Sequence, residues 1–83
     1  MEYLGENLLH GILCSMEKFT SSEAELANYI IEHPEEVSQF SISQIAKKTH
    51  ISPATITRFC QKLAFSGFNE FKHELKRYLD LKN

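Results

Sequence analysis

The chain has 83 residues, 42% of them hydrophobic, and its nine aromatic residues are six Phe and three Tyr. This length allows one domain, residues 1–83, with a modest core. Three Gly, two Pro and the lack of an alternating run of Val, Ile and Thr argue against a strand-and-turn architecture, so we predict an all-α fold.

Charge is divided unevenly along the sequence. Residues 1–41 contain one basic and eight acidic residues, a net charge of −7, whereas residues 42–83 contain eight basic and three acidic residues, a net charge of +5. The overall net charge of −2 conceals this basic half. Such asymmetry is expected when one face of a protein meets a polyanion.

The apolar stretches are far shorter than a membrane span, and the first ten residues have no basic region ahead of an apolar one. We therefore predict a cytoplasmic protein without a membrane partner. Cys14 and Cys60 lie in separate helical patterns on apolar faces, which predicts two reduced cysteines in the core.

The first predicted helix spans residues 4–17 and has a helical period of apolar residues, interrupted by Gly11. It either covers the core of its own domain or pairs with a second copy in a homodimer, and the sequence leaves both alternatives open. In the second case the dimer contact consists of Leu8, Leu9, Ile12, Leu13 and Met16.

Three further helices flank the centre of the chain. Thr20 and Glu23 supply a cap for a helix over residues 21–33, and Pro34 starts a short one over residues 34–38. After a break at residues 64–67, Asn69 offers a cap for a last helix that ends near Asp80.

Residues 42–63 predict two short helices joined by a tight turn. Ser52 and Pro53 are a strong start signal for the second helix, because Ser can cap free N–H groups and the φ of Pro suits the first helical turn. His50 falls at the corner, where a left-handed backbone is usual and His is tolerated. Four apolar residues would interlock two crossed helices there: Ile45, Ile51, Ile56 and Phe59. We predict a compact bundle of five to six helices with a helix-turn-helix, homeodomain-like or winged-helix-like.

The second of these helices has a polar side that matches DNA chemistry. Its predicted base-reading residues are Ala54, Thr57, Arg58 and Gln61, since Arg pairs with guanine, Gln with adenine, and Ala can touch a thymine methyl group. Residues at helix starts or flanks are predicted to hold phosphates: Ser43, Gln44, Ser52, Thr55, Lys62, Ser66 and Lys72.

Two other classes of function compete with DNA binding. A polar helix face is commonly only solvated, and the chain could be a helical dimerisation or protein-interaction module without DNA binding, a difference that salt-dependent DNA binding would reveal. An enzyme is disfavoured, because the titratable residues do not converge by spacing. His10 and Cys14 are four residues apart, but no second pair follows, so we expect no metal site and no cofactor.

The sequence is similar to a known family over about residues 19–79. Four stretches carry the resemblance: LANYI followed by Pro34, SQIA at residues 43–46, ISPATITRF at residues 51–59, and FSGFNEFK at residues 65–72. They resemble the N-terminal domain of RpiR-type transcriptional regulators. The resemblance implies a domain that binds operator DNA as a dimer in bacterial control of carbohydrate genes. It also implies a C-terminal SIS domain that binds a phosphosugar effector, and this chain stops at Asn83 without one.

Overall fold

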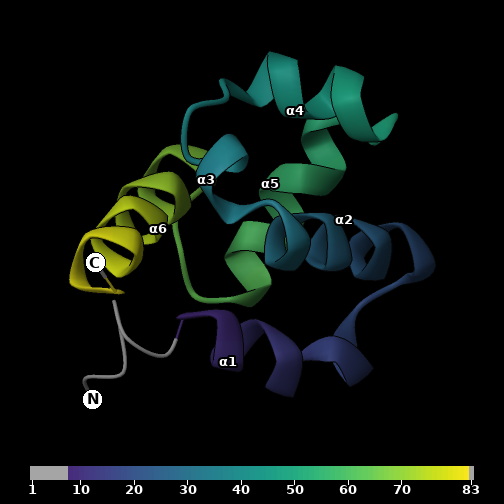
Figure 1. Ribbon diagram of the computed structural model, residues 1–83. Helices are drawn as coiled ribbons and strands as arrows, with labels where there is room; N and C mark the ends of the chain where they lie inside the picture. Colours follow the sequence, from purple (N-terminus) through teal and green to yellow (C-terminus); the bar gives the residue numbers. More distant parts are fainter. Residues whose placement is uncertain (1–7, 83) are drawn as a thin grey trace.

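The computed structural model describes residues 8–82, in which every regular element is a helix and no strand is present. The elements in chain order are α1 (Leu8–Cys14), the 3₁₀ turn η1 (Met16–Lys18), α2 (Ser21–Glu32), α3 (Pro34–Val37), α4 (Ile42–Thr49), α5 (Pro53–Lys62) and α6 (Phe68–Lys82). In Figure 1, α5 runs through the middle of the bundle, with α4 beyond one of its ends and α1 beyond the other. The predicted all-α bundle with a helix-turn-helix is confirmed.

Side-chain caps fix where α2, α4 and α5 begin. Thr20 Oγ1 accepts from the Glu23 backbone N–H, and Glu23 accepts from the Thr20 N–H, so the predicted cap is a full capping box. Ser41 and Gln44 form a second capping box at α4, which we did not foresee. Ser52 Oγ accepts from the Thr55 N–H at 3.2 Å, confirming the predicted start of α5.

Two predicted helix boundaries were wrong. The first helix ends at Cys14 rather than at residue 17, because a turn at Ser15 leads into η1; residues 4–7 lie outside the described part. Asn69 does not cap the last helix, because α6 already begins at Phe68. The loop before it is closed by Glu70, whose carboxylate accepts from the Ser66 N–H at 2.6 Å.

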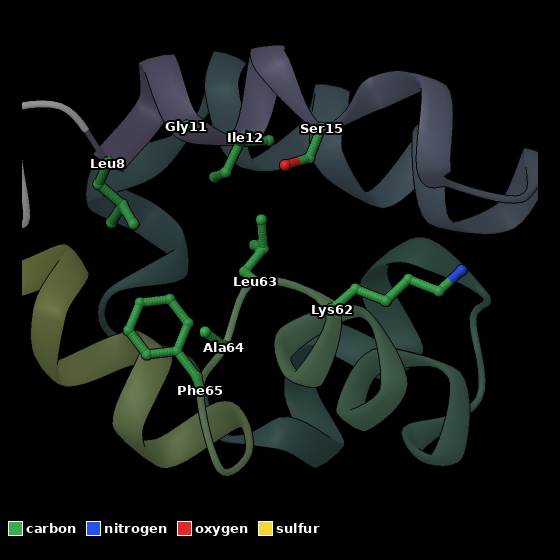
Figure 2. A pocket seen from close by; sticks show the side chains of 8 residues that line it. All are labelled: Leu8, Gly11, Ile12, Ser15, Lys62, Leu63, Ala64 and Phe65. Atoms are coloured by element: carbon green, nitrogen blue, oxygen red, sulfur yellow. The ribbon is translucent and has the colours of Figure 1, made fainter.

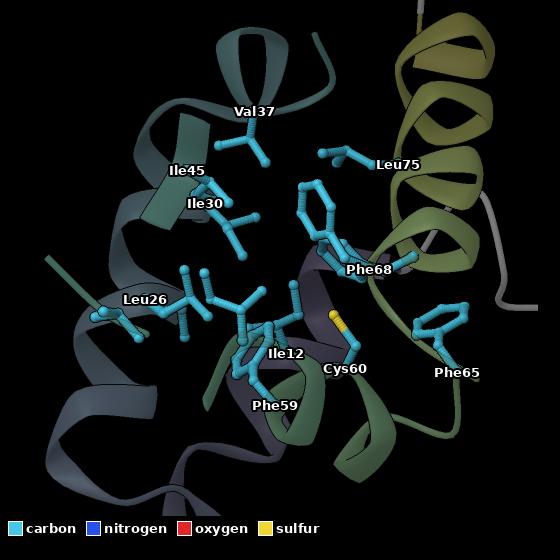
Figure 3. Close-up of a cluster of buried hydrophobic side chains, with 14 of the residues drawn as sticks. Ile12, Leu26, Ile30, Val37, Ile45, Phe59, Cys60, Phe65, Phe68 and Leu75 are labelled. Carbon is cyan, nitrogen blue, oxygen red and sulfur yellow. The ribbon is translucent and has the colours of Figure 1, made fainter. Parts of the chain in front are cut away.

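One apolar core joins all the α-helices. Its buried residues include Ile45, Ile51, Ile56 and Phe59, as the predicted helix-turn-helix requires, together with Phe65, Phe68, Phe71 and Leu75 from the C-terminal part. Figure 3 shows Phe59 and Cys60 of α5 pointing into this cluster beside Ile12 of α1. The inner side of α5 is thus packed on several sides, which holds the helix in one orientation.

The cysteines have different environments. Cys60 is buried as predicted, and burial raises the pKa of its thiol to about 12, so it stays protonated and inert. The prediction for Cys14 was wrong: this residue is exposed, because α1 turns a different side to the core.

The residues of α1 divide between two environments. Leu8 and Ile12 are buried in the core of their own chain, whereas Leu9 of α1 and Met16 of the following turn η1 are only partly buried against it. Leu13 is 54% exposed. The core alternative therefore holds for Leu8 and Ile12, which leaves Leu13 as the most accessible of the five predicted dimer residues.

No helix within residues 8–82 is both long enough and apolar enough to cross a membrane.

Candidate nucleic-acid interface

The corner between α4 and α5 has the backbone that the sequence predicted. His50 lies in the left-handed region with φ 60° and ψ 31°. The preceding turn of α4 is closed by Thr49, whose hydroxyl donates to the Ile45 carbonyl at 2.7 Å. Since Ile45 and Ile56 are both fully buried, the two helices are locked together on their inner sides.

The four predicted base-reading residues lie on the outer side of α5. Ala54, Arg58 and Gln61 are exposed and Thr57 is half-buried, and their spacing of three or four residues aligns them along one face. The opposite face carries the buried Ile56, Phe59 and Cys60. A rigid helix therefore presents a row of donors and acceptors to solvent.

Hydrogen bonds hold two of these side chains before any ligand arrives. Ser52 Oγ donates to Thr55 Oγ1 at 3.0 Å, and the Arg58 guanidinium donates to the same oxygen at 3.3 Å. Gln61 Nε2 donates to the Ser66 carbonyl at 3.4 Å. These contacts reduce the rotamer freedom that base recognition would otherwise have to remove.

A hollow of about 300 Å³ lies beside this face. It is lined by Ile42 at the start of α4, Thr57 of α5, and residues 66–70 at the start of α6. The structure thus brings Ser66 next to the outer face of α5. The loop N–H of Ser66, however, is already paired with Glu70.

The other predicted phosphate ligands are placed less uniformly. Ser43 and Ser52 are exposed in the first turn of α4 and at the cap of α5. Gln44 is exposed, but its Oε1 accepts from the Ser41 N–H at 2.8 Å and so completes the capping box. Thr55 is half-buried and receives two hydroxyl or guanidinium hydrogen bonds.

Lys72 and Lys62 have structural partners that the sequence did not reveal. Lys72 Nζ donates to the Phe40 carbonyl at 2.8 Å and lies 5.6 Å from the centre of the Phe68 ring. Lys62 Nζ donates to Glu23 Oε1 at 2.6 Å and to the Lys18 carbonyl at 3.1 Å. Both amines therefore fasten α6 and α5 to earlier parts of the chain, and neither projects freely toward a ligand.

Glu23 is the buried half of the Lys62 ion pair, with a relative exposure of 2%. Burial by itself raises the pKa of this carboxyl, but the hydrogen bond from Lys62, the Thr20 N–H and the positive charges of Lys62 and Arg58 together lower it below its usual value. The carboxylate is consequently ionised at neutral pH. Only the role of Glu23 in the helix cap was predictable from the sequence.

The far end of α5 borders a second hollow, of about 200 Å³, between α1 and residues 62–65. In Figure 2 the Leu63 side chain points across it toward Ile12, while the Lys62 side chain extends away from its apolar end. Here α5 ends with φ 74° at Ala64, and the Phe65 N–H donates to the Cys60 carbonyl. The left-handed residue after a helix is usually Gly, which explains why the left-handed conformation of Ala64 was not recognised from the sequence.

Two potential metal ligands lie close together on α1. Cys14 Sγ and His10 Nε2 are 3.4 Å apart on α1. Across residues 8–82, no group of three or more His, Cys, Asp or Glu side chains is arranged to hold a metal ion.

Comparison with known proteins identifies the domain. A model of the helix-turn-helix domain of the rpiR family matches residues 6–82. The chain belongs to the RpiR family. The N-terminal domain of the transcriptional regulator YbbH from Bacillus subtilis has a similar structure, with a TM-score of 0.82, 28% identity, and coverage of 90% of this chain and 92% of that one. Membership and fold together make this an RpiR-type helix-turn-helix domain of the kind that transcriptional regulators use to bind DNA.

Two longer relatives are transcriptional regulators by name. An uncharacterised HTH-type regulator of Haemophilus influenzae is 42% identical over 93% of this chain, and HexR of Pseudomonas aeruginosa is 31% identical over 89% of it. The matched regions are 27% and 26% of those proteins. The chain thus spans about a quarter of the length of these relatives.

Two basic residues of this RpiR-type domain were missed as ligand candidates. Lys47 and Lys48 are exposed in the last turn of α4, just before the corner at His50. Lys48 Nζ lies 3.9 Å from a Glu36 carboxylate oxygen, a distance typical of a weak surface pair. Their position on the first helix of the helix-turn-helix was the signal that could have identified them.

Proposed function

We propose that the domain reads operator DNA by placing α5 in the major groove. The observation that supports this most is the division of α5 into a fully buried inner face and an outer face with Ala54, Thr57, Arg58 and Gln61. In this family of motifs the second helix contacts base edges while the first crosses the backbone. Arg58 would donate to guanine and Gln61 would pair with adenine.

Phosphate contacts would come from groups that the fold leaves accessible. Ser43, Ser52 and Ser66 are exposed near the ends of α4, α5 and α6, and Lys47 adds an exposed amine. Such contacts fix the register of the protein on the duplex without reading sequence. Lys62, Lys72 and Gln44 would contribute mainly by holding the fold, since their polar ends already have partners.

The complete regulator would act as a homodimer in the cytoplasm and control carbohydrate genes in response to a phosphosugar. These features rest on family resemblance, and the sensing would reside in a C-terminal SIS domain rather than in residues 8–82. The DNA-binding domain itself carries no proposed reaction, metal or cofactor.

The proposal predicts strongly salt-dependent binding to duplex DNA. A duplex selected from a random pool should bind with a logarithmic slope against salt of about −0.9 for each phosphate that the protein neutralises. Fluorescence anisotropy with a labelled duplex at several salt concentrations measures this slope. Failure of the folded protein to bind any duplex at low salt would contradict DNA reading and favour a protein-interaction module.

A second prediction concerns assembly through α1. Since Leu13 is 54% exposed and Leu9 is partly buried, Leu13→Glu should dissociate a dimer formed by this face while leaving the fold intact. Sedimentation or size-exclusion with light scattering measures the mass, and circular dichroism checks the fold. Glu17→Gln, at an exposed position in η1, is the control. A variant that remains dimeric would place the dimer contact elsewhere.

A further inference from the structure

The carboxylate of Glu23 connects three parts of the chain. Its Oε1 accepts from the Thr20 N–H at 3.0 Å and from Lys62 Nζ at 2.6 Å. The same amine donates to the Lys18 carbonyl at 3.1 Å. One buried oxygen therefore joins the start of α2 to Lys62, the last residue of α5, and the amine extends the connection to η1.

An aromatic contact reinforces the same junction. The Phe19 ring, between η1 and α2, lies 4.9 Å from the ring of Phe59 on the inner face of α5, measured between centroids. Phe59 is directly next to Arg58 in the chain, and Lys62 directly follows Gln61. Two of the four side chains expected to read bases, Arg58 and Gln61, thus each have a chain neighbour that contacts residues 18–23.

An ion pair whose carboxylate is buried, as that of Glu23 is, adds little net stability, because removing the carboxylate from water offsets much of its attraction to the ammonium. It does, however, impose geometry, since the carboxylate and the ammonium satisfy each other only at close range. In this domain the pair can fix both the axial position and the rotation of α5. A change in the axial position or in the rotation of α5 would move Arg58 and Gln61 relative to the groove.

We propose that Glu23 is a positioning residue for sequence recognition: it holds α5, through Lys62, at the position from which Arg58 and Gln61 read bases. This inference rests on the proposed DNA-reading function. Glu23 is only 2% exposed, so it would act through Lys62 and α5 rather than by touching DNA.

The direction in which DNA affinity changes in a Glu23 variant distinguishes a positioning role from a purely electrostatic one. Glu23→Gln removes a negative charge and leaves the charge of Lys62 unneutralised, so electrostatics alone would tighten binding to every duplex. If Glu23 positions α5, the variant should instead bind the selected duplex more weakly. Its affinity for random DNA should be unchanged or slightly higher. The ratio of the two affinities is therefore the decisive quantity.

The experiment compares wild type with Glu23→Gln, Glu23→Asp and a matched control, Glu25→Gln, on the selected and a random duplex at one salt concentration. Glu25 is exposed on the same helix, so its variant removes the same charge without touching the junction. Glu23→Asp keeps the charge but shortens the side chain by one methylene, and any loss it causes comes from geometry. Circular dichroism sets a temperature at which all four proteins are folded.

We expect the affinity ratio to fall about tenfold in Glu23→Gln, the size that one charge-assisted hydrogen bond supports, with a smaller fall in Glu23→Asp and none in Glu25→Gln. A wild-type ratio in Glu23→Gln, or equal losses on both duplexes, would overturn the positioning role while wild-type DNA binding stands. If the wild type binds no duplex, the proposed function fails, and this inference fails with it.

Discussion

Replacing Phe59 by alanine should lower the free energy of unfolding by about 3–5 kcal/mol, the largest stability loss expected from a substitution in α5. Phe59 is 0% exposed, and its ring centre lies 4.9 Å from that of Phe19 and 6.1 Å from that of Phe71. The truncation removes the transfer free energy of the ring and leaves a cavity between segments that come from three parts of the chain. Urea denaturation followed by circular dichroism measures the difference.

The control is an apolar side chain that is shortened at the surface, which shows how much stability is lost when hydrophobic atoms are removed outside the core. Leu81 is 58% exposed, so Leu81→Ala should change the free energy of unfolding by no more than about 0.5 kcal/mol. Comparable losses in the two variants would mean that Phe59 does not anchor α5. Because domains of this size have only about 5–15 kcal/mol of stability, we expect Phe59→Ala to remove a large part of it.

What could be foreseen from the sequence is mainly local. The cap at Ser52, the start at Pro53 and the left-handed corner at His50 depend on neighbouring residues, and all three are present. The buried set Ile45, Ile56 and Phe59 followed from helical periodicity alone. Local rules therefore placed the helix-turn-helix and the outer face of α5 correctly.

What could not be foreseen depends on contacts distant in the chain. Lys62 meets Glu23 across 39 positions, and Lys72 meets the Phe40 carbonyl across 32. Periodicity places such amines on a polar side but does not say which carboxylate or carbonyl lies within reach. The prediction for Cys14 failed for a related reason. The apolar residues of α1 cover a wide arc of the helix surface, so more than one face could pack on the core. Tertiary packing selects the face with Leu8 and Ile12, which leaves Cys14 exposed.

The prediction with the largest effect on recognition is the loss of the Arg58 guanidinium. Arg58→Ala should weaken binding to the selected duplex by about 1–3 kcal/mol, the usual range for an Arg that pairs with a guanine edge. The side chain is exposed and held by Thr55 Oγ1, so its removal leaves no cavity in the core. Anisotropy titrations with selected and random duplexes measure the two affinities.

Lys47→Ala supplies the comparison, because it removes one exposed positive charge from the adjacent helix α4 and changes no residue of α5. A phosphate contact at Lys47 would weaken both duplexes alike and reduce the salt slope by about 0.9, whereas a base contact at Arg58 would act mainly on the selected duplex and relax the base preference at one position. Equal losses on both duplexes for the two variants would reduce Arg58 to another phosphate contact. Base reading would then have to rest on Gln61, Thr57 and Ala54, and a selection repeated with Gln61→Ala would show which base pair had changed.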